Sequence, residues 1–218
     1  MSGYVSDAVI RRLPLYYRHL QELEQEGVMQ ISSQDLGERM QLTPSQIRQD
    51  INSFGGFGRQ GYGYPVRSLK EHIRKVMGLD EEHRMVIVGA GRIGTAIAQY
   101  AFFEREGFIT VAMFDAEPEK VCPEDKNRPV YPVAELENRI PELKPDIAVL
   151  SLPAESAQGV LDRLYALGVR AVWNFAPVDL HHPRDLALVN VHLSDSLHIL
   201  SYRMHQMKTE EDGDNQTI

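Results

Sequence analysis

The chain has 218 residues, of which 43% are hydrophobic, and it carries a formal net charge of −8 at pH 7. This length fits one large domain or two small ones, with enough apolar residues for buried cores. No apolar run reaches the roughly 18 residues of a membrane span, and the first residues lack the order of a signal peptide. The single cysteine excludes an internal disulfide, so the composition predicts a cytoplasmic protein. The eight histidines show no metal-ligand spacing, and no metal site is predicted.

Two helices are predicted at the start of the chain. Apolar residues recur at helical spacing over 6–26, and Pro14 either kinks this helix or starts its regular part. Segment 31–40 predicts a second helix, which Ser32 or Ser33 can cap through a side-chain oxygen.

A third helix carries a candidate DNA-reading face. Thr43 can cap it, and Gln46 completes a capping box. Ile47, Ile51 and Phe54 fall on one buried stripe. Two short helices with a tight turn predict a helix-turn-helix, and a helical hairpin with a polar outer face is the alternative. The residues off the stripe suit the hydrogen-bonding edges of DNA bases; they are Ser45, Gln46, Arg48, Gln49 and Asn52.

The glycine-rich and aromatic segment 54–66 predicts a β-hairpin wing, whose tip can approach a DNA backbone closely. We expect Arg59 to reach phosphates or a narrow minor groove, and Tyr64 to contact DNA as well. Ser68 then caps a last helix that ends at Gly78. Residues 1–80 are therefore predicted to form an α+β winged-helix DNA-binding domain.

The next stretch has the parts of a dinucleotide-binding βαβ unit: the apolar run 85–88, a Gly-x-Gly-x-x-Gly turn, a helix, a second apolar run and a terminal acid. Glycines let the backbone approach a pyrophosphate, which the helix N-terminus holds. Asp115, 21 residues after Gly94, would bond the ribose hydroxyls and repel a 2′-phosphate, which favours NAD(H) over NADP(H). A glycine-rich turn without a ligand is the alternative. The predicted cofactor residues here are Gly89, Ala90, Gly91, Arg92, Ile93, Gly94 and Asp115.

Apolar strands then alternate with helices, as expected of a parallel sheet covered on both faces. We predict strands over 146–153, 171–175 and 188–192, helices over 133–140 and 155–167, and an α/β Rossmann-type domain over 85–193. Ligands of such sheets lie beyond the carboxyl ends of the strands. The candidate walls for the nicotinamide half are Leu152, Pro153, Asn174, Phe175, Ala176 and Pro177; ordinary strand exits are the alternative.

A helix with an apolar stripe closes the chain. The stripe consists of Leu193, Leu197, Leu200, Met204 and Met207, and no later element can cover it. Such a helix, over residues 194–207, packs either on its own domain or on a partner, and the family resemblance described below favours dimerisation. The acidic tail 208–218 is predicted to be disordered.

Several of these motifs resemble the Rex family of redox-sensing transcriptional repressors. The likeness is carried by the recognition helix and wing at 45–66, by 12–18, by the glycine turn at 89–94 and by 174–177, and it spans about residues 9–204. It implies a homodimer with a swapped C-terminal helix that binds a palindromic operator. It also implies that NADH and NAD+ set the affinity for DNA, with NADH typically releasing the operator.

Two positions depart from the family pattern. Gln49 stands where the family usually carries a lysine or arginine, which predicts altered operator contacts. His192 stands where the family usually has an aspartate that exchanges bonds with residues matched here by Arg18 and Tyr100. A histidine cannot supply that negative charge, so we hypothesise a rewired switch at Arg18, Tyr100 and His192. Simple packing of His192 is the alternative.

Two other classes of protein compete with a sensor. An NAD-dependent oxidoreductase needs a proton donor or base beside the nicotinamide, and the candidate walls offer none of the usual ones. A DNA-binding paralogue with an altered or lost redox response is the other rival. The sequence therefore favours a regulator that binds NAD(H) without turnover.

Overall fold

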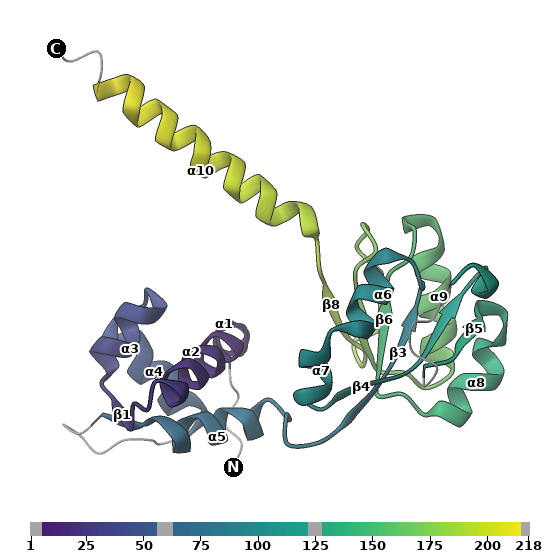
Figure 1. Ribbon diagram of the computed structural model, residues 1–218, viewed down its shortest axis with the longest axis horizontal. Coiled ribbons are helices and arrows are strands. Elements are labelled where there is room, and N and C mark those ends of the chain that lie inside the picture. Colours follow the sequence, from purple (N-terminus) through teal and green to yellow (C-terminus); the bar gives the residue numbers. More distant parts are fainter. Residues whose placement is uncertain (1–5, 56–62, 122–127, 215–218) are drawn as a thin grey trace. The chain divides into compact units, whose positions relative to one another are not determined.

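The computed structural model describes residues 6–55, 63–121 and 128–214, with the backbone alone for 210–214. It divides into two compact units, Met1–Glu81 and Glu82–Ile218 (Figure 1). The first unit contains α1 (Asp7–Ile10), α2 (Leu13–Gln25), β1 (Gln30–Ile31), α3 (Ser33–Met40), α4 (Pro44–Phe54), β2 (Tyr64–Pro65) and α5 (Val66–Val76). Among the described residues, no helix is long and apolar enough to cross a membrane.

The first predicted helix is two helices in the structure. It breaks after Ile10, and Pro14 lies in the first turn of α2. Proline fits there because the first-turn N–H groups have no intrahelical acceptor. Of the two readings of Pro14, the start of the regular helix is the one observed. The cap of α3 is also as predicted, since Ser32 accepts a hydrogen bond from the backbone N–H of Asp35 at 3.0 Å.

Helix α4 follows its predicted pattern at the backbone and departs from it at one side chain. Thr43 caps the helix by accepting from the N–H of Gln46 at 3.2 Å. Ile47 and Ile51 are fully buried in the core of this unit. The predicted capping box is wrong in its second half: the side chain of Gln46 does not return to the backbone of Thr43, because its amide donates to Asp50 instead.

The described part of the wing is a short antiparallel pair. Tyr64 lies opposite Ile31, and Pro65 lies opposite Gln30. The strand runs directly into α5, so the cap predicted at Ser68 is wrong: the helix starts at Val66, two residues earlier. The rest of the wing, with Arg59, lies outside the described residues.

The second unit is built on a parallel sheet whose strand order is β5-β4-β3-β6-β7-β8. This is the order of dinucleotide-binding domains, with a switch point between the first strand and its later neighbour, here β3 and β6. Its strands are β3 (His83–Val88), β4 (Phe108–Asp115), β5 (Val130–Pro132), β6 (Ile147–Leu150), β7 (Ala171–Asn174) and β8 (Ala187–Asn190). Strand β5 is not among the predicted strands, because its three residues are too few to show a period.

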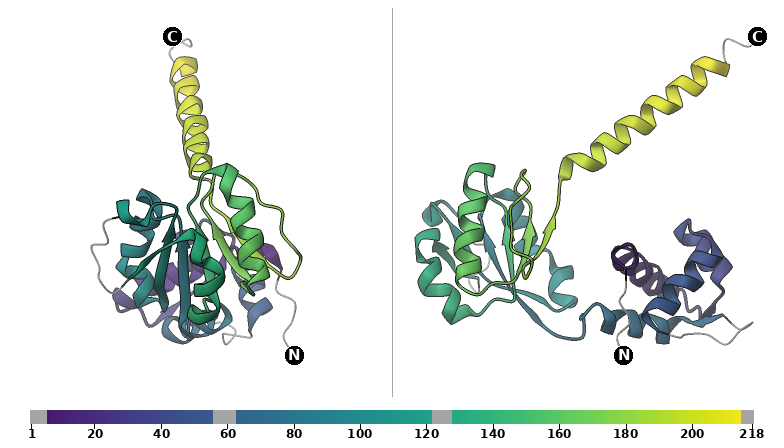
Figure 2. Two further views of the ribbon diagram at one scale, coloured as in Figure 1. Left: turned by 90° about the vertical axis from the view of Figure 1, so that its right-hand side faces the viewer. Right: turned by 180° about the vertical axis from the view of Figure 1, so that it is seen from behind.

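Helices cover both faces of the sheet, as predicted (Figure 2). Val86 and Val88 of β3 pack into a core with α8 and α9, whereas Met85 and Ile87 pack into a second core with α6 and α7. This alternation follows from the two-residue period of a strand. The helices and 3₁₀ turns of this unit are α6 (Arg92–Gln99), α7 (Ala101–Arg105), η1 (Pro118–Lys120), η2 (Val133–Glu135), α8 (Leu136–Leu143), α9 (Ala154–Ala166) and α10 (Leu193–Asp214).

The last helix is longer than predicted. Helix α10 continues to Asp214, so the disorder expected from residue 208 is wrong over 208–214. Glutamate and lysine are good helix formers, and the acidic composition of this segment does not prevent a helix that is already nucleated. The five residues of its apolar stripe are 51–65% exposed.

Candidate functional site

The glycine turn meets the end of β6 at very close range. Gly89 has a φ of +99°, and a Cβ there would lie 2.3 Å from the carbonyl oxygen of Ser151. A Cβ on Gly94 would lie 2.0 Å from the carbonyl oxygen of Gly89. The side chain of Ser151, at the carboxyl end of β6, also donates to that oxygen at 2.7 Å. These two glycines are therefore required by the fold itself, where β3, the turn and α6 pack against β6.

Gly91 differs from the other two glycines. Its φ is an ordinary −70°, and among the described residues no atom lies within 4 Å of a Cβ built on it. The position faces a cavity of about 510 Å³ over the N-terminus of α6. A glycine that neither the backbone conformation nor packing requires, facing open space at a helix N-terminus, fits the close approach of an anionic group.

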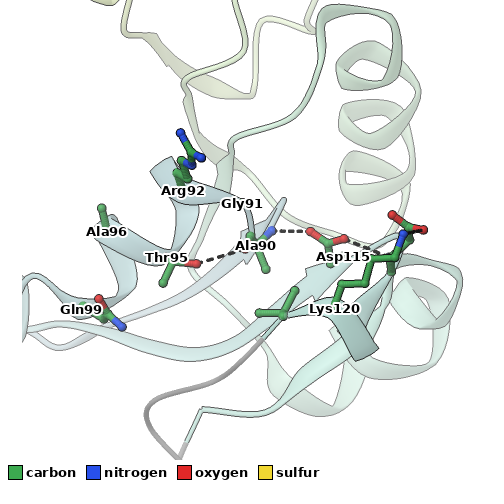
Figure 3. A pocket seen from close by; sticks show the side chains of 10 residues that line it. Ala90, Gly91, Arg92, Thr95, Ala96, Gln99, Asp115 and Lys120 are labelled. Carbon is green, nitrogen blue, oxygen red and sulfur yellow. Dashed lines mark hydrogen bonds and ion pairs between the residues drawn. The ribbon is translucent and has the colours of Figure 1, made fainter.

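Asp115 closes the other end of this cavity (Figure 3). One carboxylate oxygen accepts from the N–H of Ala90 at 2.7 Å, and the other accepts from the N–H of Glu117 at 2.9 Å. These bonds tie the end of β4 to the glycine turn and leave lone pairs for ligand hydroxyls. The lining consists of Ala90, Gly91, Arg92, Thr95, Ala96, Gln99, Asp115, Glu117, Lys120 and Val121.

Four of the predicted cofactor residues line this cavity: Ala90, Gly91, Arg92 and Asp115. Gly89 and Gly94 shape the turn behind it, and Ile93 is 41% exposed on α6. The residues that the sequence did not indicate come from α6 and from the polar segment after β4, where an ion pair joins Lys120 to Glu117. Nothing in the sequence marks these loop residues as part of a pocket.

The residues predicted to line the nicotinamide site, which follow β6 and β7, differ in how exposed they are. Leu152 and Phe175 are half-buried, while Pro153 and Pro177 are exposed. Asn174 is fully buried. Its amide nitrogen donates to the carbonyl of Val178 and to the side chain of Asn190, each at 2.9 Å, and its oxygen accepts from the N–H of Ala176 at 3.0 Å.

The assignment of Asn174 as a cofactor ligand is therefore corrected. Its side chain holds the loop after β7 together, and it has no solvent-accessible surface to offer to a ligand. Ala176, 1% exposed, belongs to the same buried turn and to the core under it.

Helix α4 presents a polar outer face. Ser45, Arg48, Gln49 and Asn52 are all exposed, and Arg48 donates to the hydroxyl of Ser33 on α3 at 3.1 Å. This face has the side chains that a recognition helix uses to bond base edges and phosphates.

Tyr64 does not belong to that face. It is 8% exposed and packs in the core of the first unit, and burial raises the pKa of its hydroxyl. We therefore withdraw it as a DNA contact and assign it to the core.

The three predicted switch residues are described separately in their own units. Arg18 is exposed on α2, and Tyr100 is 57% exposed between α6 and α7, beside Phe103 with ring centroids 5.0 Å apart. His192 lies directly before α10, and its Nε2 is 3.1 Å from Oδ1 of Asp179. No sequence pattern indicates Asp179, because it lies in the irregular segment between β7 and β8.

Comparison with known proteins places the chain in a family. The family model "Putative DNA-binding protein N-terminus" matches residues 4–52, and the model "CoA binding domain" matches residues 80–178. The Redox-sensing transcriptional repressor Rex of Thermoanaerobacter sp. (strain X514) is 48% identical over 202 residues, which cover 93% of this chain and 90% of that protein. The chain belongs to the Rex family of transcriptional repressors.

Another Rex repressor and two solved structures of a Rex-family repressor are also similar to this chain over most of its length. The repressor of Clostridium botulinum (strain Eklund 17B / Type B) is 46% identical over 204 residues, which cover 94% of this chain and 97% of the relative. A crystal structure of RSP in complex with beta-NAD+ and operator DNA has a TM-score of 0.87 at 46% identity, covering 98% of this chain and 99% of the other. RSP in complex with beta-NADH gives 0.88 at 44% identity, with coverages of 96% and 98%. The predicted Rex resemblance and the predicted fold class are confirmed.

Proposed function

We propose that this Rex-family protein is a DNA-binding transcriptional repressor that senses the balance of NADH and NAD+. One observation carries the proposal. A single chain joins a helix-turn-helix with a polar outer face to a dinucleotide-binding fold whose glycine turn faces an open cavity. The relatives named above are repressors, and RSP has been seen with both nicotinamide dinucleotides and with operator DNA. Sensing requires that the two modules respond to each other's ligands.

The cavity over α6 favours NAD(H) as the ligand. The N-terminus of α6 at Gly91 and Arg92 would hold the pyrophosphate, and Asp115 would accept bonds from the ribose hydroxyls. A bound dinucleotide would supply the redox-sensitive nicotinamide ring. The carboxylate of Asp115 would repel the 2′-phosphate of NADP(H), and equally the 3′-phosphate of coenzyme A. Of the residues that the sequence assigns to the nicotinamide half, Leu152, Pro153, Phe175 and Pro177 have exposed surface and remain predicted contacts, whereas Ala176 is buried with Asn174.

The proposed DNA contacts are the exposed side chains of α4 together with the wing. Ser45, Arg48, Gln49 and Asn52 would face a major groove, and Arg59 would follow the backbone or the minor groove. Gln49 replaces a cation of the family pattern, so the salt dependence of binding is expected to fall by about one unit of slope.

A homodimer is the proposed assembly. The stripe on α10 has the spacing 4-3-4-3 from Leu193 to Met207, which is the seam of a helix that pairs with another apolar surface. All five residues are more than half exposed, and a second copy of this chain would cover them. A two-fold dimer also matches the symmetry of a palindromic operator. We place this regulator in the cytoplasm, binding NAD(H) without turnover.

We further propose that Arg18, Tyr100 and His192 form the switch that the family resemblance implies. His192 lacks the charge of the aspartate usual in the family, but Asp179 lies 3.1 Å from its ring and is bonded by Asn190 as well. Asp179 would then supply the negative charge at this point of the fold. In this proposal the rewired switch carries its negative charge on Asp179 instead of on residue 192, and its preference between NADH and NAD+ would differ from that usual in the family.

A gel-shift series with a palindromic operator tests the function. The duplex is titrated with protein alone and with NAD+, NADH, NADPH or coenzyme A. We expect NADH and NAD+ to change operator affinity to different extents, and NADPH and coenzyme A to have little effect. NADH fluorescence that stays constant in the presence of common 2-keto acids and aldehydes would agree with binding without turnover, whereas steady consumption of NADH would favour an oxidoreductase.

A further inference from the structure

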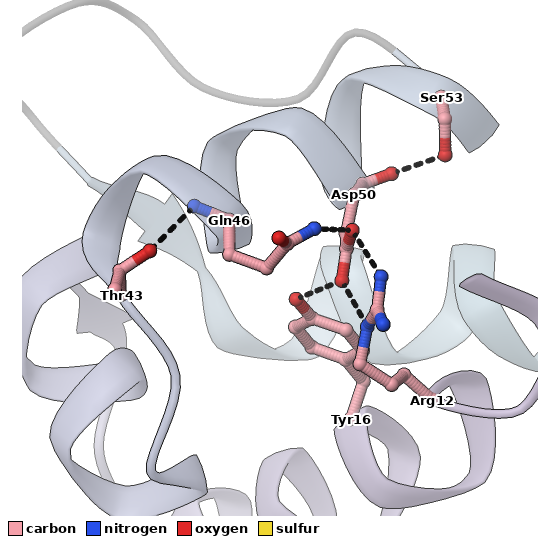
Figure 4. A network of polar contacts seen from close by, with 6 residues as sticks. All are labelled: Arg12, Tyr16, Thr43, Gln46, Asp50 and Ser53. Atoms are coloured by element: carbon pink, nitrogen blue, oxygen red, sulfur yellow. Dashed lines mark hydrogen bonds and ion pairs between the residues drawn. The ribbon is translucent and has the colours of Figure 1, made fainter. Parts of the chain in front are cut away.

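A buried charge cluster joins α2 to the recognition helix (Figure 4). Asp50 of α4 has no exposed surface. Its Oδ2 accepts from Nε of Arg12 at 2.7 Å and from the hydroxyl of Tyr16 at 2.9 Å. Its Oδ1 accepts from Nη2 of Arg12 at 2.8 Å and from Nε2 of Gln46 at 2.7 Å. Each carboxylate oxygen therefore has two donors, and the amide of Gln46 is one of them.

The cluster fixes which way the amide of Gln46 points. Burial opposes the ionisation of Asp50, but the bonds from Arg12, Gln46 and Tyr16 outweigh it and hold the pKa of the carboxyl below its usual value. Asp50 is thus ionised and can only accept hydrogen bonds. Rotating the amide by half a turn would place its oxygen against a carboxylate oxygen and would leave Oδ1 of Asp50 one donor short.

The other end of the amide is available. Gln46 is the third residue of α4 and only half-buried. Within the described parts of the chain, its Oε1 has no hydrogen-bond partner. Residues in the first turns of a recognition helix are the ones that reach base edges in the major groove.

We propose that Gln46 reads the operator through Oε1 alone, as an acceptor for the exocyclic amino group of a cytosine or an adenine. In the major groove those amino groups are the donors of the bases, at N4 of cytosine and N6 of adenine. An acceptor such as N7 or O6 of guanine could use only the second N–H of Nε2, because Asp50 takes the first. Arg12, Asp50 and Tyr16 are positioning residues in this scheme, because they act on DNA only through Gln46. The inference rests on the proposed DNA-binding function.

The test uses base analogues in a palindromic duplex that is first selected from a random library with the full-length protein. Each adenine of a half-site is replaced in turn by purine, which lacks the N6 amino group, or by 7-deazaadenine, which lacks N7. Each cytosine is replaced by 2-pyrimidinone, which lacks the N4 amino group. Dissociation constants are measured for the wild type, Gln46→Ala and Gln46→Met, after thermal melts establish that each variant folds.

At one position we expect amino-group removal to weaken wild-type binding about 5-fold per half-site, or about 25-fold when both half-sites are changed, since one hydrogen bond is lost in each. The Gln46 variants should be insensitive to that removal, and 7-deazaadenine at the position should leave wild-type affinity unchanged. Gln34→Ala is the matched control, because Gln34 makes the same amide-to-carboxylate bond, to Glu38 at 3.3 Å on α3. It should keep the wild-type profile.

The positioning role has its own readout. Arg12→Lys keeps a cation beside Asp50 but lacks the planar guanidinium fork, whose two N–H groups bond the two carboxylate oxygens in parallel. It should lower discrimination at the Gln46 position severalfold while preserving discrimination at the other bases, which a general loss of stability would not do. The inference is overturned if the Gln46 variants keep the wild-type analogue profile, if no amino group matters, or if loss of N7 at the Gln46 position matters only when Gln46 is present. Failure to select any duplex would instead refute the proposed function and, with it, this contact.

Discussion

A methyl group at Gly91 separates the ligand role of the glycine turn from its structural role. Gly91→Ala adds a Cβ where no described atom lies within 4 Å, at a φ of −70° that alanine adopts freely. The folded state should tolerate this change, and removing a glycine from the unfolded chain stabilises by about 0.4–1 kcal/mol. The melting temperature should therefore stay level or rise slightly.

Binding should respond in the opposite direction. The added methyl group occupies the surface through which a pyrophosphate would approach the N-terminus of α6. Hydrogen bonds to charged groups contribute about 1.5–3 kcal/mol each. Losing one or two of them should cost roughly 3 kcal/mol, which is about a 100-fold increase in the dissociation constant for NADH.

Isothermal calorimetry with NADH and a thermal melt of the same samples measure both effects. Gly159→Ala is the matched control, since this glycine lies within α9 and a Cβ at its position would also have no described atom within 4 Å. It should gain up to about 1 kcal/mol of stability and bind NADH normally. Wild-type affinity in Gly91→Ala would refute the assignment of this turn to the pyrophosphate.

Three other substitutions probe the packing of the turn, the ribose contact and the buried charge cluster. Gly94→Ala drives a Cβ to 2.0 Å from a backbone oxygen and should destabilise the second unit by about 3 kcal/mol; an unchanged melt contradicts the packing. Asp115→Asn should weaken NADH binding and reduce the preference over NADPH in a fluorescence titration; an unchanged ratio would remove Asp115 from ribose recognition. Arg12→Met leaves the buried Asp50 carboxylate without its main partner and should cost about 3 kcal/mol in urea unfolding, whereas Arg11→Met, at an exposed pair, should have no measurable effect. Because the folded pKa of Asp50 is lowered, its stabilisation is present above about pH 4 and is lost as the pH falls through the folded pKa. The cost of Arg12→Met should thus be smaller at pH 3 than at pH 7.

The parts of the site that follow from local sequence were predictable. The glycine turn, Asp115 and the Thr43 cap depend on residues within one βαβ unit or one helical turn, so spacing alone indicates them. The sequence predicted a parallel sheet but not its strand order, which pairs strands that lie far apart along the chain, such as β3 with β6.

The parts that depend on distant contacts were not predictable. Asp50 looks like one more polar residue on α4, and only the fold brings Arg12, 38 positions earlier, against it. Asn174 was predicted to contact the dinucleotide because it ends a parallel strand, and Tyr64 to contact DNA because it lies in the predicted wing, yet both are buried. Burial is a property of the tertiary structure, and neither side chain lies in a pattern whose period reveals it.

A redox sensor of this kind requires the dinucleotide site and the DNA-reading helix to influence each other's affinity. The most direct measurement is a calorimetric titration of NADH and of NAD+ into the free protein and into its complex with operator DNA. Linkage requires that DNA change dinucleotide affinity by the same factor as the dinucleotide changes DNA affinity. We predict a factor of about 5–150 for at least one oxidation state, as expected for a coupling of roughly 1–3 kcal/mol. Equal affinities in the free and DNA-bound protein, for both NADH and NAD+, would contradict a sensing role.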